Sequence, residues 1–257
     1  MTELLALLLD GTNISPTMFG FMILSAFVSA IYQSVSGLAG ALLLVIILSP
    51  FLGIKVAVPL VAVSTFVSNI ARYWVFRRQF NLPVFLSIIV TALPGMIIGA
   101  LAFVALPVQT LAFLIGLFLL ASIPGRRFMT NKGIVVGRLG FLAVGGIYGL
   151  VGGVTMGAGL LLAPFFLGAG ITGGQIVALT SLLGTTLNFT KIVVFGASPL
   201  LTIEFLIIGL IIGLIAAPGA YIGRWILNST SVRAHTLLVE GIMGAGAAFF
   251  FWQAFAG

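Results

Sequence analysis

The chain contains no cysteine and only one histidine, His235, and these shortages exclude several classes of protein. Without cysteine there is neither a disulfide nor a thiolate metal site, and one histidine cannot form a histidine cluster. No paired carboxylates share a helix face, so the sequence lacks the reactive groups that a membrane enzyme needs. We therefore predict no enzymatic activity, no cofactor and no metal site.

Charged residues are also scarce, at 6% of the 257 residues, whereas 61% are hydrophobic and the mean hydropathy is +1.33. A water-soluble domain would not find enough polar surface at this composition, so the chain is predicted to lie in a lipid bilayer. Its apolar runs are of spanning length and are separated by short polar turns, which predicts helices rather than a barrel. The predicted fold class is an all-α polytopic membrane protein.

The net charge of +7 and the pI near 10.6 are not interpreted as a nucleic-acid surface. The eleven basic residues are spread along the chain and lie mainly in loops between apolar runs. Such residues are typical topology signals, because cytoplasmic loops of membrane proteins collect Lys and Arg.

The sequence contains an internal duplication in which the same short motifs return in the same order. A duplicated apolar chain with a short, glycine-interrupted segment in each half indicates a secondary transporter. In the first copy the motifs are Gly37-Leu38-Ala39-Gly40-Ala41, Ala62–Thr65, Asn69–Arg72 and Pro94–Gly99, and in the second they are Gly157-Ala158-Gly159, Ala178–Ser181, Asn188–Lys191 and Pro218–Gly223.

Ten apolar segments are predicted, five in each copy. The first copy covers residues 1–123, a cytoplasmic linker covers 124–133, and the second copy covers 134–257. The segments are 17–36, 40–52, 56–76, 82–105, 107–123, 134–151, 156–169, 173–195, 200–223 and 234–254.

If all ten segments cross, nine basic residues face one side and only Lys55 and Lys191 face the other. Equivalent loops of the two copies then carry opposite charge: the turn after Arg72 is basic, whereas its counterpart at 196–199 is uncharged. This pattern predicts two inverted repeats of about five segments each. An alternative in which the two short segments are re-entrant leaves eight crossings and a weaker charge bias.

The short segments are the strongest candidates for a binding site. A helix over Ala41–Leu52 is about 18 Å long, against a hydrocarbon core of about 30 Å, so one end stops inside the membrane. The glycines place the helix N-terminus there, and two such N-termini form a site for an anion. The alternative is that the glycines only allow close helix packing. The candidates are Gly37, Gly40, Ala41, Gly157 and Gly159.

Polar side chains near the middle of apolar segments complete the predicted substrate site. The hydroxyls are those of Ser64, Thr65, Thr180 and Ser181. They donate to an oxyanion or, alternatively, to their own helix backbone. Asn69 and Asn188 occupy equivalent positions, which indicates a shared cavity or a structural bond between helices.

Three charged residues lie in or beside the same segments. Arg72 and Lys191 each follow an asparagine by three residues, and we predict that they attract an anion from opposite sides or else snorkel to the interface. Glu240 is the one carboxylate deep in an apolar run. It is a candidate for proton coupling or for pairing with a basic residue.

These motifs resemble those of the TauE/SafE family of membrane permeases, the sulfite exporter family, over almost the whole chain. The first glycine cluster is sparser than is usual in the family because Ala39 and Ala41 interrupt it. The resemblance implies export of a small sulfur-containing anion, such as sulfite or an organosulfonate, across the cytoplasmic membrane of a bacterium. A passive anion channel and a non-transporting scaffold are the alternatives, and the sequence is compatible with a homodimer.

Overall fold

The computed structural model describes residues 11–12, 14–36, 39–131, 137–227 and 232–256, and helix is the regular secondary structure found there. The all-α prediction is confirmed, because every predicted apolar segment contains helix. In chain order the elements are α2 (Pro16–Ser36), α3 (Gly40–Leu52), α4 (Ile54–Phe76), the 3-10 turn η1 (Arg77–Gln79), α5 (Leu82–Ala105), α6 (Val108–Asn131), α7 (Arg138–Val154), the 3-10 turn η2 (Ala158–Leu161), α8 (Ala163–Gly168), α9 (Gly174–Gly196), α10 (Ile203–Ala216), α11 (Gly219–Leu227) and α12 (Val232–Ala256).

Local sequence explains several of the helix boundaries. Asn81 is the N-cap of α5, and its side chain accepts a hydrogen bond from the Val84 amide at 3.2 Å. Pro83 stands in the first turn of α5, where its missing amide costs nothing. Gly53 has a φ of 74°, so it ends α3 and lets α4 begin at the next residue.

Length and composition confirm a membrane protein. Within the described ranges, six helices are long and apolar enough to cross a bilayer, and the bent pair α10 and α11 brings the total to seven. The elements α3 and α7 and the segment from η2 to α8 are shorter. Large apolar side chains point outward, such as Leu139 and Trp225, which are 81% and 76% exposed. Lipid covers such a surface in a membrane.

The two Pro-Gly motifs of the duplication differ in the structure. The chain bends by 42° between α10 and α11, at Pro218. By contrast, α5 continues through Pro94. Likewise, α6 continues through Pro124 to Asn131, so helix covers most of the segment 124–133 that was predicted as a linker. Membrane helices tolerate an internal proline when other groups satisfy the freed carbonyl.

Glycines set the closest helix contact, which joins α5 to α7. Gly145, Gly149 and Gly153 recur every four residues on α7 and face α5. A methyl group at Gly149 would lie 2.7 Å from the carbonyl carbon of Ala92, so only glycine fits there. This is the small-residue packing that membrane helices use to approach closely.

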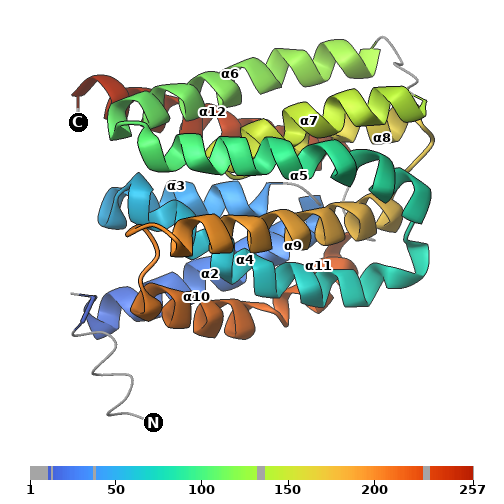
Figure 1. The fold of residues 1–257 in the computed structure, drawn as a ribbon. Helices are drawn as coiled ribbons and strands as arrows, with labels where there is room; N and C mark the ends of the chain where they lie inside the picture. Colours follow the sequence, from blue (N-terminus) through green and yellow to red (C-terminus); the bar gives the residue numbers. More distant parts are fainter. Residues whose placement is uncertain (1–10, 13, 37–38, 132–136, 228–231, 257) are drawn as a thin grey trace.

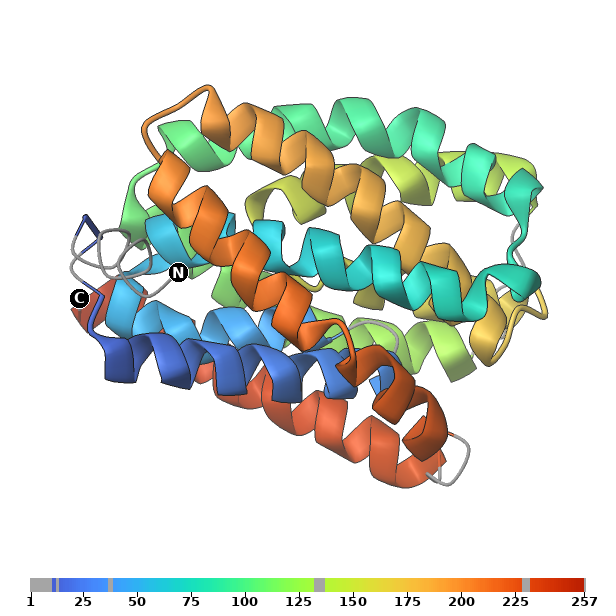
Figure 2. The same ribbon diagram turned by 90° about the horizontal axis from the view of Figure 1, so that it is seen from below.

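The helices α4 and α9 pack against each other in the interior of the bundle. The colours in Figures 1 and 2 show that the chain runs in opposite directions along these two helices, and likewise along α6 and α12. Figure 1 also shows that α3 and the segment from η2 to α8 begin near the middle of the bundle and run toward opposite ends. The two copies of the duplication therefore meet at α4 and α9.

Candidate functional site

A cavity of about 60 Å³ lies between α4, α7 and α9, next to the starts of both short segments. One water needs about 10–15 Å³ measured in this way, so the cavity has room for several waters or a small ion. Its lining includes eight of the residues predicted from the sequence. These are Ala41, Asn69, Arg72, Gly157, Gly159, Thr180, Asn188 and Lys191.

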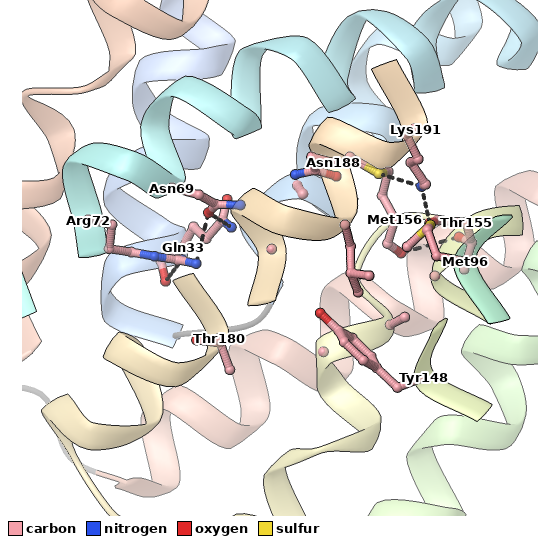
Figure 3. A pocket seen from close by; sticks show the side chains of 17 residues that line it. Gln33, Asn69, Arg72, Met96, Tyr148, Thr155, Met156, Thr180, Asn188 and Lys191 are labelled. Carbon is pink, nitrogen blue, oxygen red and sulfur yellow. Dashed lines mark hydrogen bonds between the residues drawn. The ribbon is translucent and has the colours of Figure 1, made fainter. Parts of the chain in front are cut away.

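Arg72 is 3% exposed and lines the cavity from α4 (Figure 3). Its guanidinium donates three hydrogen bonds: from Nε to Ser181 Oγ at 2.7 Å, from Nη1 to the Gln33 carbonyl at 3.0 Å, and from Nη2 to Asn69 Oδ1 at 2.9 Å. All three acceptors are neutral. The side chain is therefore fixed in place without a counter-charge.

Lys191 is 1% exposed and lines the cavity from α9. Its Nζ donates to the Thr155 carbonyl at 2.8 Å and to Met156 Sδ at 3.1 Å. Figure 3 shows Lys191 and Arg72 at opposite ends of the group of lining side chains, with Asn69 and Asn188 between them. Both cations face the same cavity from opposite ends.

The burial of these cations excludes one of the two predicted alternatives. Arg72 and Lys191 do not snorkel to the interface, because both are buried within the bundle. Each donates to a carbonyl at the C-terminal end of the first helix of its own copy, Gln33 in the last turn of α2 and Thr155 just after α7. The negative end of a helix dipole stabilises a cation. A site predicted to rely on neutral donors thus contains two formal charges.

No acidic residue is present among the described residues that line the cavity. Glu240 lies on α12, which packs against α6, and it is not part of the lining. Glu204 is partly exposed in the first turn of α10 and is not part of the lining either. The electrostatic potential in the cavity is therefore positive, and Arg72 and Lys191 are its sources.

The polar motifs of the two copies bond to each other across the interface between α4 and α9. Asn188 Nδ2 on α9 donates to Thr65 Oγ1 on α4 at 3.0 Å, while Arg72 on α4 donates to Ser181 on α9. Thr65 and Ser181 are the fourth residues of the duplicated Ala-x-[Ser/Thr]-[Ser/Thr] motif. Both hydroxyls are outside the lining, but each holds a residue that is in it.

Three of the four predicted hydroxyls, those of Thr65, Thr180 and Ser181, donate to carbonyls of their own helices, as the alternative interpretation expected. Thr180 lines the cavity, yet its Oγ1 donates to the Ile176 carbonyl at 2.8 Å. Ser64 is buried away from the cavity, with its carbonyl against α10, where a methyl group at Gly213 would approach within 2.6 Å. The Ser64 backbone therefore packs against α10, outside the cavity lining.

The glycine-rich segments differ from each other. Gly157 has a φ of 82°, and a methyl group there would lie 2.9 Å from Leu42 Cβ, so the second segment contacts α3 at this residue. Gly40 packs against Gln33 and Ser29 of α2, which matches the close-packing alternative. Gly37 lies outside the described residues.

Only the first short segment forms a regular half-helix. The second consists of the 3-10 turn η2 and the six-residue helix α8. The left-handed backbone at Gly157 makes the chain turn sharply before η2, so a long helix does not start there. The predicted pair of helix N-termini is therefore replaced by one helix N-terminus, that of α3, and a tight turn.

Sequence reasoning missed several lining residues: Gln33, Met96, Tyr148, Thr155 and Met156. The Tyr148 side chain is 6% exposed and directs its hydroxyl toward the cavity in Figure 3. Gln33 donates from Nε2 to Asn69 Oδ1 at 3.1 Å. The sequence could have indicated Gln33, because an amide side chain inside an apolar run needs hydrogen-bond partners just as Asn69 and Asn188 do.

The fold and the site define a polytopic helical membrane protein whose central cavity is lined by two buried cations. The chain matches the family model described as "Sulfite exporter TauE/SafE" over residues 22–250, and it belongs to that family. The predicted family is thereby confirmed, and it is a family of membrane transporters. No curated protein and no solved structure matches the chain.

Proposed function

We propose that the protein is a secondary transporter that exports a small sulfur-containing anion, such as sulfite or an organosulfonate, across the cytoplasmic membrane of a bacterium. The observation that carries this proposal is the pair of buried cations, Arg72 and Lys191, facing one cavity with neutral partners. An unpaired buried ion costs several kcal/mol. A bound oxyanion offsets this cost for both residues at once.

The neutral groups of the cavity suit the same ligand. Sulfite presents three oxygens that accept hydrogen bonds, and the cavity offers N–H groups on Arg72, Lys191 and Asn188 and the hydroxyl of Tyr148. The volume of about 60 Å³ favours sulfite over a larger organosulfonate.

Alternating access between two inverted repeats is the proposed mechanism. It is supported by the opposite chain directions of α4 and α9 (Figure 2), because these helices carry equivalent motifs and both line the cavity. In inverted-repeat transporters the substrate lies at the repeat interface, and one repeat rocks against the other around it. Bonds such as that between Asn188 and Thr65 would have to change during this motion.

The orientation follows from the charged ends of the bundle. The turn η1, the start of α7 and the helix α11 lie toward the same end of the bundle, and the start of α4 lies at the other end (Figure 1). The first three carry Arg77, Arg78, Arg138 and Arg224, whereas the start of α4 carries Lys55. We assign the arginine-rich end to the cytoplasm.

Flux of ³⁵S-labelled sulfite from proteoliposomes tests the proposal, with protein-free liposomes as the reference. A transporter gives flux that saturates with sulfite concentration. Flux that rises linearly without saturation would indicate a channel, and flux equal to that of protein-free liposomes would indicate a scaffold. Replacing the exposed Arg138 with Gln provides a matched control, because it removes a positive charge far from the cavity lining.

A further inference from the structure

The empty cavity and the occupied cavity differ in charge. Arg72 keeps its charge because arginine is not deprotonated in proteins, and its three protein acceptors are all uncharged. Lys191 likewise bonds to a carbonyl and a thioether. Without an anion, the cavity therefore contains two basic side chains, and no described lining residue carries a negative charge that balances them.

This charge affects the conformational change as well as binding. When one copy moves against the other, the cavity passes through a closed state in which water is excluded and the charges are least solvated. A doubly charged oxyanion neutralises both cations during that passage. An empty cavity has no such compensation, so its barrier is higher.

We infer that the protein is an anion exchanger, in which the empty cavity changes sides slowly and a second oxyanion bound from the opposite side returns the carrier. This inference rests on the proposed transport function. The exchanged partner is another small oxyanion with two negative charges, because two cations must be neutralised.

Proteoliposomes loaded with ³⁵S-sulfite test the inference. Valinomycin and equal potassium on both sides fix the membrane potential at zero, so that net efflux is not limited by charge accumulation. Efflux is measured into gluconate and into saturating unlabelled sulfite. We expect external sulfite to accelerate efflux at least tenfold, which corresponds to a difference in barrier of about 1.4 kcal/mol.

Two charge-removing variants refine the test. Replacing Lys191 with Gln leaves one uncompensated charge in the empty cavity, so the ratio of exchange to net efflux should fall at least threefold at saturating sulfite. Arg138→Gln removes an exposed charge instead and should keep the wild-type ratio. If Lys191→Gln fails to fold, the wild-type ratio alone still decides the matter.

The outcomes separate the two proposals. Equal efflux into gluconate and into sulfite, at rates above those of protein-free liposomes, leaves the transporter intact and overturns exchange. Net efflux that reaches the exchange rate when a proton gradient is imposed also overturns exchange, because a proton then returns the carrier. Absence of flux under every condition overturns the transport function, and exchange with it.

Discussion

Replacing Arg72 with glutamine is the sharpest perturbation of the proposed site. Glutamine removes the charge from the cavity and keeps an amide that can still reach some of the former partners. Removing one member of a buried charge pair costs about 2 to 5 kcal/mol. We therefore expect the Kd for sulfite to rise roughly 30-fold or more. A lysine at the same position retains the charge without the three-point attachment, so its loss should be smaller.

Ionic strength distinguishes a buried cation from an exposed one. Interactions between exposed charges are screened within about 8 Å at physiological salt, whereas buried pairs are screened much less. Since Arg72 is 3% exposed, the loss of affinity should be the same at low and high potassium gluconate.

Isothermal titration of detergent-purified protein with sulfite measures both effects, and Arg138→Gln serves as the control for a lost positive charge. The melting temperature of each variant must be recorded to separate binding from unfolding. An affinity within threefold of wild type for Arg72→Gln, or a loss that disappears at high salt, would refute a buried anion site at this residue.

Three further perturbations address the backbone, the amides and the topology. Gly157→Ala places a side chain in a left-handed backbone, at a cost of about 1–2 kcal/mol, and should lower the melting temperature; an unchanged melting temperature would argue against the φ of 82°. Asn69→Leu and Asn188→Leu should each reduce sulfite flux at near-normal abundance, because both amides line the cavity; wild-type flux in both variants would make them packing residues. The chain has no native cysteine, so single cysteines at opposite ends of α9, Ala197→Cys and Thr172→Cys, can each be labelled with an impermeant maleimide. In intact cells only Ala197→Cys should react. Labelling of Thr172→Cys alone would reverse the assigned orientation.

Repetition explains how much of the site could be predicted. Asn69, Arg72, Asn188 and Lys191 are polar residues in apolar runs at matched positions of a duplicated sequence, and all four line the cavity. The apolar runs predicted the helices, since a run of spanning length has few other stable structures in a membrane.

The depth of the two cations was not predictable in the same way. The sequence left two alternatives for them, attracting an anion or snorkelling to the interface as long basic side chains often do. The helices α4 and α9 instead cross in the interior, and the carbonyls of Gln33 and Thr155 turn toward them. Such contacts depend on how distant segments pack.

The shape of the second short segment also depends on tertiary contact. Its glycines resemble those of the first, and equal half-helices were the natural expectation. The contact between Gly157 and Leu42 and the left-handed backbone at Gly157 produce a tight turn there instead. One local signal does distinguish the two segments, because Pro164 stands in the first turn of α8 and the first segment has Ile46 at the matching place.

The central claim is that Arg72 and Lys191 hold the transported anion between α4 and α9. Selenite has the geometry and charge of sulfite, and its selenium scatters anomalously, so a crystal grown with selenite locates the site directly. The account predicts an anomalous peak in the cavity, between the Arg72 guanidinium and Lys191 Nζ. The crystal is grown at a selenite concentration that inhibits sulfite flux. A selenium peak elsewhere and none in this cavity would contradict the account.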